Sequence, residues 1–277
     1  MAKGTGLIGN FKGKVGNTVG YKLAASNNGQ TQGIRVYQPI VKNPKTAAQA
    51  EQRAKLLAVN ATYRALKMVI DRGNEGLPYG NKSRLAWLKG ALKATQMPWF
   101  EKGAVVDAAV VCQLTKGSLA GVRYTVDDSS INISVPGASR EATYGTIGAV
   151  STALIGAYPS LKEGDQMTFV YLSHKDGALQ SVVESIIINP TSTAVTTKFQ
   201  ANDNRIDVLF DLTGGVGAVI ISREGVNGEH LRSTASLVIY EDYETQAPYD
   251  ADSKAAAIAS YQASAANNTD WAEESIQ

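Results

Sequence analysis

Residues 167–188 read MTFVYLSHKDGALQSVVESIII. Two runs rich in β-branched and aromatic residues, Met167–Ser173 and Val182–Ile188, lie on either side of Lys175-Asp176-Gly177, a sequence typical of a turn. Residues of these types favour a pleated, half-buried strand. The stretch therefore predicts two β-strands and makes β-sheet the main structure of the second half of the chain.

Seven further runs of this kind lie between residues 104 and 240, and turn sequences such as Asn202-Asp203-Asn204 and Gly214-Gly215 separate them. They are Ala104–Cys112, Gly121–Val126, Ile131–Val135, Val195–Phe199, Ile206–Leu212, Ala218–Ser222 and Leu231–Tyr240. Short strands at this spacing indicate a mainly antiparallel domain, β-sandwich-like or barrel-like, at residues 104–245. A short helix at Thr146–Ala157 is expected to interrupt the strands.

A helical hairpin is expected before this domain, over residues 43–103. The first helix has Asn43 as its candidate N-cap and Pro44 at the first helical position, and Gly73 is expected to end it. Its apolar stripe is Leu56, Val59, Tyr63, Leu66 and Ile70, and the stripe of the second helix, at about 83–95, is Leu85, Leu88 and Leu92. Basic residues occupy the other faces, so the outer surface of the hairpin is expected to be strongly basic.

The two ends of the chain complete the predicted α+β fold. Residues 1–42 form a basic Gly-rich arm, and glycines spaced by three and four residues would make a helix there costly. Short strands are expected instead, at Phe11–Val15, Thr18–Leu23 and Ile34–Gln38. Residues 246–277 form an Ala-rich tail in which a helix at Ser253–Ala266 is either exposed or docked on the rest of the chain.

Charge is distributed unevenly along the chain. Residues 1–110 carry 17 Lys and Arg against 5 Asp and Glu, a net charge of +12, whereas residues 111–277 carry 10 against 20, a net charge of −10. Seven basic residues precede the first acidic residue, Glu51. Such a separation is expected of a protein that contacts a polyanion or the acidic face of a neighbouring subunit.

Sequence motifs for enzymatic chemistry are weak. The string GTGLIG at residues 4–9 matches a dinucleotide-binding fingerprint, but no strand can precede it in three residues. Two histidines, His174 and His230, and one cysteine, Cys112, are too few for a usual transition-metal site. No apolar run reaches the 18 residues of a membrane span. We therefore predict no catalytic residue, no cofactor, no metal ion and no membrane partner.

One acidic cluster, Glu241, Asp242 and Glu244, follows the last predicted strand. Paired carboxylates can bind Ca²⁺ or act as acid and base, but a run of this kind is more often a solvated acidic face. In this chain it is also a candidate electrostatic counterpart for the basic arm of a neighbouring copy.

The basic arm carries the main predicted contacts with nucleic acid or with another subunit. They are Lys3, Lys12, Lys14, Lys22, Arg35, Lys42 and Lys45, with Arg53, Arg64, Lys89 and Lys93 of the helical hairpin as a second group. Phe11, Tyr21 and Tyr37 are interleaved with them and offer stacking surfaces. The alternative is that these cations only solvate a Gly-rich hairpin. The pattern supports non-specific contact with a polyanion and does not indicate sequence-specific recognition of bases.

The segment 33–57 carries a resemblance to a known family. Its Asn43, Pro44, Lys45, Thr46, Gln49, Gln52 and Arg53, together with GKVGN at residues 13–17, resemble an uncharacterised Gly-rich family of gut bacteria and of their phages and prophages. Similar Asn-Pro-Arg-Thr segments resemble parts of phage particle proteins. The resemblance is dense over residues 1–120 and implies a particle or assembly role without enzymatic activity. It implies the class of protein and no specific position in a particle.

These observations lead to one expectation and one main alternative. The expectation is a phage virion structural protein that assembles in the host cytoplasm, with copies of itself, other virion proteins and DNA or RNA as partners. Its position in the particle, as capsid, tail or internal protein, stays open. The alternative is a nucleic-acid-binding accessory protein that builds no particle. An adhesin-like module or a carbohydrate-active enzyme is a third and weaker interpretation.

Overall fold

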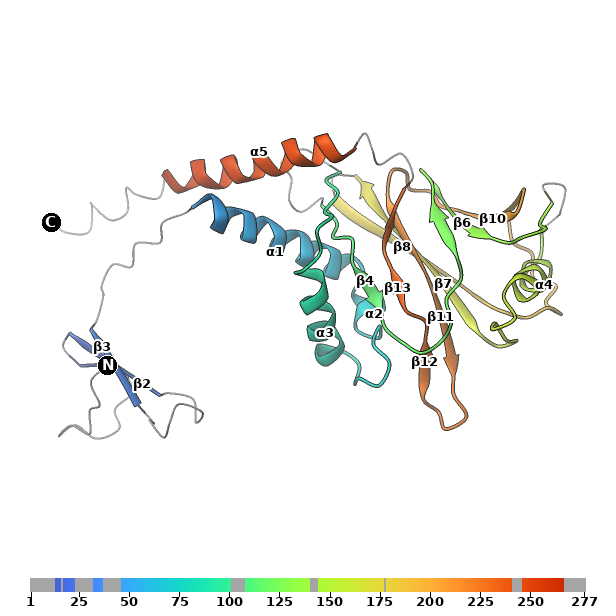
Figure 1. Cartoon of the computed structure of the whole chain (residues 1–277), viewed down its shortest axis with the longest axis horizontal. Helices are drawn as coiled ribbons and strands as arrows, with labels where there is room; N and C mark the ends of the chain where they lie inside the picture. Colours follow the sequence, from blue (N-terminus) through green and yellow to red (C-terminus); the bar gives the residue numbers. More distant parts are fainter. Residues whose placement is uncertain are drawn as a thin grey trace. The chain divides into compact units, whose positions relative to one another are not determined.

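The computed structural model describes residues 13–15, 17–22, 32–36, 46–100, 108–139, 144–176, 178–240 and 246–266 (Figure 1). Two compact units divide the chain, residues 1–45 and residues 46–277. Together they combine helices with antiparallel sheets, so the fold is α+β.

The first unit contains a three-stranded antiparallel sheet in the order β1-β2-β3, with β1 at Gly13–Val15, β2 at Thr18–Lys22 and β3 at Gln32–Val36. Val15 pairs with Thr18, so the connection from β1 to β2 is two residues long, Gly16 and Asn17. The expected strand positions Phe11, Lys12, Leu23, Tyr37 and Gln38 lie outside the described residues.

The second unit has a layer of helices, which are α1 at Ala47–Ala65, α2 at Lys67–Ile70, α3 at Asn81–Ala91 and α5 at Gln246–Ala266. The predicted N-cap Asn43 is wrong: α1 begins after Thr46, whose hydroxyl accepts a hydrogen bond from the Gln49 amide at 3.3 Å. The first helix is also not continuous to Gly73, because Leu66, with φ −111° and ψ 22°, separates α1 from α2.

The predicted apolar stripes are buried in part: Val59, Leu66 and Ile70 are at most 1% exposed, and Tyr63 and Leu88 pack against the same hydrophobic cluster. Leu56, Leu85 and Leu92 are 40–49% exposed. Small residues take their places in the interior, with Ala50, Ala54 and Ala58 buried on α1 and Ser83, Trp87 and Ala91 buried on α3. A small side chain lets the helix backbone approach its neighbours closely, so the buried faces combine these small residues with part of the predicted stripes.

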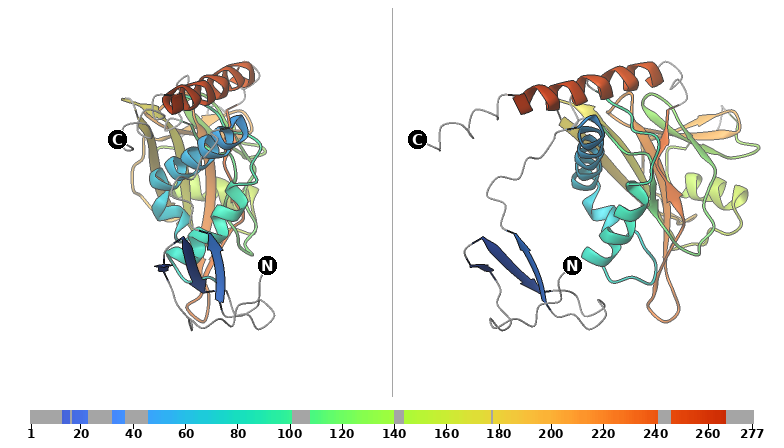
Figure 2. Two further views of the ribbon diagram at one scale, coloured as in Figure 1. Left: turned by 90° about the vertical axis from the view of Figure 1, so that its left-hand side faces the viewer. Right: turned by 60° about the vertical axis from the view of Figure 1, so that its left-hand side comes forward.

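The C-terminal helix α5 is docked and lies alongside α1, running in the opposite direction (Figures 1 and 2). Its Asp250 carboxylate accepts a hydrogen bond from the backbone amide of Trp99 at 2.7 Å. Lys254 forms an ion pair of 2.6 Å with Glu51 of α1. The tail helix thereby completes the helical layer. None of the helices in the described ranges has the length and apolar content needed to cross a membrane.

Two antiparallel sheets follow the helices. The four-stranded sheet has the order β5-β6-β10-β9, with β5 at Tyr124–Val126, β6 at Ser130–Ser134, β9 at Phe199–Asn202 and β10 at Arg205–Leu209. The five-stranded sheet has the order β12-β11-β7-β8, and β14 also pairs with β11. Its strands are β7 at Gln166–Lys175, β8 at Ala178–Ile187, β11 at Val216–Glu224, β12 at His230–Arg232 and β14 at Val238–Ile239. A short pair joins β4 at Gln113–Thr115 to β13 at Ala235–Ser236.

Two predicted strands are wrong in their described parts. Residues 108–112 form no strand; there the amides of Ala109 and Val111 donate to the carbonyls of Pro98 and Gln96, so this segment bonds to the chain after α3. In the predicted strand Val195–Phe199 only Phe199 belongs to a strand, and Val195 forms an isolated bridge to Thr146. The helix expected at Thr146–Ala157 is confirmed as α4 at Ile147–Ala157, with Thr146 as N-cap.

Strands β7 and β11 lie between two hydrophobic clusters. Phe169, Tyr171 and Val219 face a cluster shared with the four-stranded sheet and α4, whereas Val170 and Ile220 face a cluster shared with α1, α2 and α3. Because side chains alternate along a strand, each of these strands contributes to both clusters. The second unit therefore has three layers, which are the helices, the five-stranded sheet and the four-stranded sheet with α4 (Figures 1 and 2).

Candidate interaction surfaces

The register of the N-terminal sheet brings two predicted contact residues into one row. Lys14 of β1 and Arg35 of β3 pair with the same residue of β2, Val19, from its two sides. Lys22 pairs with Gln32 and belongs to a different row. Adjacent strands lie about 5 Å apart, so the fold of this segment gathers basic positions that are 21 residues apart in the sequence.

The other predicted contacts of the arm cannot be placed. Lys3, Lys12, Lys42 and Lys45 lie outside the described residues, as do the proposed acidic counterparts Glu241, Asp242 and Glu244.

The predicted basic residues of the helical layer have different surroundings. Arg64, Lys89 and Lys93 are exposed on α1, on α3 and just after α3. The guanidinium carbon of Arg53 instead lies 4.9 Å from the centre of the Tyr261 ring of α5. A cation over an aromatic face is attracted to it, so Arg53 helps to hold the tail helix on α1.

A carboxylate in the loop between α2 and α3 joins the helical layer to the sheets. The Glu75 side chain accepts hydrogen bonds from the Ser118 amide at 2.9 Å, the Ser118 hydroxyl at 2.8 Å and the Arg232 amide at 3.0 Å. The amides of Ser118 and Arg232 hold the pKa of Glu75 below its ordinary value. Gly117 lies against this carboxylate, and a Cβ there would be 2.7 Å from Glu75 Oε2. These contacts fix the loop between α2 and α3 to the segments that contain Ser118 and Arg232, and we call this arrangement the Glu75 bracket.

The lowered pKa of Glu75 predicts how its contribution to stability depends on pH. A carboxylate with a lower pKa in the folded state stabilises the fold above its unfolded pKa of about 4.3 and loses this effect as the pH falls through the folded value. The free energies of unfolding of wild type and Glu75→Gln, measured with denaturant, should differ by a constant amount between about pH 5 and pH 7. The difference should shrink below about pH 4. A difference that does not change with pH would contradict this role of the charge.

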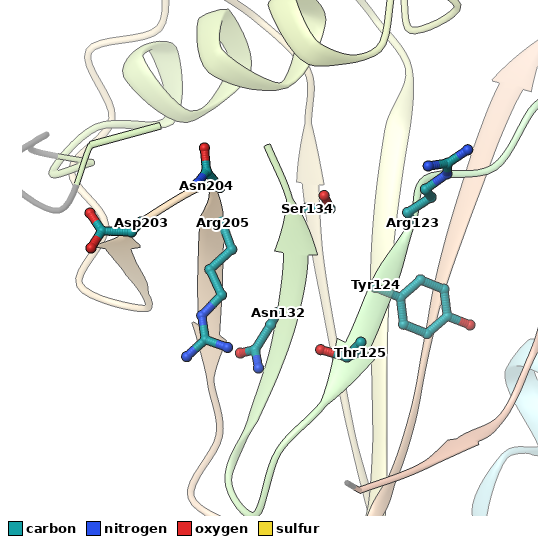
Figure 3. A pocket seen from close by; sticks show the side chains of 8 residues that line it. All are labelled: Arg123, Tyr124, Thr125, Asn132, Ser134, Asp203, Asn204 and Arg205. Atoms are coloured by element: carbon teal, nitrogen blue, oxygen red, sulfur yellow. The ribbon is translucent and has the colours of Figure 1, made fainter. Parts of the chain in front are cut away.

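A shallow depression of about 220 Å³ opens on the outer face of the four-stranded sheet (Figure 3). It is lined by Arg123, Tyr124, Thr125, Asn132, Ser134, Asp203, Asn204 and Arg205. Arg205 lies 3.2 Å from Asp207, while Arg123 points in the opposite direction from Arg205 (Figure 3). The Tyr124 hydroxyl donates to the Ser236 carbonyl at 2.7 Å. The lining offers hydrogen bonds to a polar ligand, but its charged groups do not converge on one point.

The residues with the usual catalytic chemistries are dispersed. Burial raises the pKa of the Cys112 thiol to about 11, so the thiol is protonated at neutral pH and is a poor nucleophile. His230 is exposed and its ring lies 5.7 Å from the Tyr79 ring. Within the described ranges, no group of three or more His, Cys, Asp or Glu residues is placed to hold a metal ion.

Comparison of the chain with protein-family models, with curated protein sequences and with solved structures finds no match in any of the three.

Sequence reasoning missed the bracket at Glu75 and the depression. The bracket joins residues that are 43 and 157 positions apart, and no local sequence pattern predicts such a contact. For the depression a partial signal was present, since Asn132 and Ser134 alternate with the buried Ile131 and Ile133 and so belong to the outer face of their strand.

Proposed function

We propose that the protein is a non-enzymatic structural protein of a phage-type particle that self-associates, and that its basic N-terminal segment contacts the genome or neighbouring subunits. One observation carries the proposal. The compact unit of residues 1–45 contains seven basic residues and no acidic residue, while the rest of the chain carries all the negative charge. A cationic unit joined to a chain with an acidic remainder suits contact with a polyanion or with another copy.

The second unit suits the role of scaffold in this proposal. Its two antiparallel sheets share a hydrophobic cluster, and a layer of helices covers the larger sheet. Residues 33–57 resemble an uncharacterised family of gut bacteria and of their phages and prophages, and related Asn-Pro-Arg-Thr segments resemble parts of phage particle proteins. This likeness supports a place in the virion, with assembly in the host cytoplasm. Copies of the chain and other virion proteins are the proposed partners, and DNA or RNA is the proposed partner of the basic segment.

The row formed by Lys14 and Arg35 also supports the alternative, a nucleic-acid-binding accessory protein that builds no particle. The two functions differ in the size of the assembly. Size-exclusion chromatography with light scattering, with and without nuclease, should give a large discrete assembly that survives nuclease if the protein builds a particle. A monomer or dimer that loses its absorbance at 260 nm after nuclease would favour the accessory role.

Reversing three charges of the basic segment is expected to abolish both assembly and retention of nucleic acid. The variant Lys12→Glu, Lys14→Glu and Lys22→Glu replaces attraction to phosphates or to an acidic neighbour by repulsion. Light scattering and the ratio of absorbance at 260 and 280 nm measure the two losses, and circular dichroism checks that the second unit stays folded.

A matched control separates position from net charge. The triple variant Lys116→Glu, Lys162→Glu and Lys175→Glu makes the same change in charge at exposed positions of the second unit, and we expect it to assemble normally. Equal losses in both variants, or unchanged assembly in the first, would refute a specific role for the N-terminal segment.

A further inference from the structure

Strand β8 forms one edge of the five-stranded sheet. All ten of its residues, from Ala178 to Ile187, pair with β7 in an unbroken register, and no other strand of the described residues pairs with it. An edge of this length presents a row of backbone donors and acceptors that another strand can use.

The hydrogen bonds of Ile188, the residue after β8, show in which direction the backbone N–H and C=O groups of β8 point. The Ile188 amide donates to the Asp165 carbonyl at 2.7 Å, and the Ile188 carbonyl accepts from the Gly164 amide at 2.8 Å, so Ile188 directs both groups toward the β7 side. In an antiparallel pair these directions alternate from residue to residue. The odd-numbered residues therefore direct their N–H and C=O groups outward, and these are Leu179, Ser181, Val183, Ser185 and Ile187.

Apart from Glu184, this edge lacks the charges, prolines and bulges that keep sheet edges apart. It contains no Pro and no Lys, and its continuous register shows no bulge. Val183 and Ile187 are 46% and 62% exposed on the same face of the strand. Such an edge is suited to pairing with another strand.

We propose that β8 pairs with β8 of a second copy in antiparallel orientation, around a two-fold axis at Val183. With this register Val183 meets Val183 of the second copy, Leu179 meets Ile187 and Ser181 meets Ser185. All five outward-directed residues then fall in hydrogen-bonded pairs, and the apolar residues of one copy meet those of the other on one face. The same patch serves both copies, as a two-fold interface requires.

The charges at the edge are compatible with a second copy as the occupant. Glu184 is the one charged residue of β8, and Lys198 Nζ lies 2.5 Å from its Oε1. Each edge thus carries a cation beside its anion, and two copies meet without net repulsion between like charges.

This interface rests on the self-association proposed above and adds a contact that does not use the basic segment. The test therefore uses the full chain in about 0.5 M salt, which screens exposed charges beyond a few ångströms. Sedimentation equilibrium is expected to show a dimer of wild type. Val183→Lys replaces the Val183 pair at the axis by two ammonium groups opposite each other and should raise the dimer dissociation constant about fivefold.

Val226→Lys is the matched control, because it adds the same charge at a fully exposed position between β11 and β12. We expect it to dimerise as wild type does. Hydrogen exchange gives a second readout: the odd-numbered amides of β8 should be protected in wild type and lose protection in Val183→Lys. The even-numbered amides, bonded to β7, should stay protected in both.

Equal dissociation constants for the two lysine variants would overturn the proposal, and so would a wild-type monomer at all concentrations in high salt. Neither result bears on the proposed role of the basic segment, which the charge-reversal variant tests separately at low salt. Protection of the odd-numbered amides that disappears on removal of residues 1–45, and not in Val183→Lys, would instead show that a strand of the N-terminal unit occupies this edge.

Discussion

Replacing Gly117 by Ala is expected to lower the free energy of unfolding by about 3 kcal/mol. A Cβ at this position would lie 2.1 Å from the Arg232 carbonyl oxygen, far inside van der Waals contact, and 2.7 Å from Glu75 Oε2. Neither group is free to move, because the carbonyl accepts from the Leu119 amide at 2.9 Å and the carboxylate accepts from the Arg232 amide. Urea unfolding followed by circular dichroism measures the loss.

Gly90→Ala is the control for this experiment. Gly90 lies in α3, and a Cβ there meets no atom within 4 Å. Since Ala loses less conformational freedom than Gly in a helix, the same substitution should stabilise the protein by about 0.5–1 kcal/mol. Combining Gly117→Ala with Glu75→Gln should give a non-additive loss, because the two residues share one contact. A Gly117→Ala variant as stable as the Gly90→Ala variant would contradict the close packing of this bracket.

Removing the carboxylate of Asp165 is expected to have a comparable or larger effect, about 3–5 kcal/mol. The side chain is 1% exposed, and its two oxygens bind Arg223 at 2.6 and 2.7 Å. One oxygen also accepts from the Lys162 amide at 2.8 Å. The hydrogen bonds that Arg223 donates to Asp165 raise the pKa of Arg223, which stays charged, so Asp165→Ala leaves a partly buried cation without its anion.

The same unfolding experiment on Lys254→Ala shows what an exposed ion pair contributes. Lys254 and Glu51 are 2.6 Å apart, but their side chains are 40% and 47% exposed. Solvent screens such a pair, and we expect little change in the unfolding midpoint. If Asp165→Ala and Lys254→Ala were equally mild, the bond between Asp165 and Arg223 would not anchor the loop before β7 to β11.

Strong local patterns predicted the centre of the fold well. The run 167–188 with its turn sequence corresponds to β7 and β8, and the helix predicted at 146–157 corresponds to α4. For the two strands the signal lies within neighbouring residues, as runs of β-branched and aromatic side chains on either side of a turn sequence. These elements can be recognised without knowledge of contacts with distant parts of the chain, although β7 also pairs with the distant strand β11.

The faces of the helices were predicted only in part, because their partners are distant in sequence. Val59, Leu66 and Ile70 of the predicted stripes are buried. The leucines at positions 56, 85 and 92 are exposed, however, and α1 and α3 also bury small residues and Trp87. Part of what packs on α1 is α5, some 200 residues later, and its face includes the buried Ser253 and Ala257. Likewise, the sequence suggested Arg53 as a contact for nucleic acid, whereas Tyr261 lies beneath its guanidinium group.

The docking of α5 also affects when the chain can fold during its synthesis. The amide of Trp99 bonds to Asp250, a residue made 151 positions later, and α1 receives its α5 partners only after that point. Contacts between such distant residues slow folding, since a long loop must close first. During synthesis on the ribosome, part of the surface of α1, α2 and α3 stays uncovered until residues near 261 have been added. Chains released before then are expected to aggregate more readily than the complete protein.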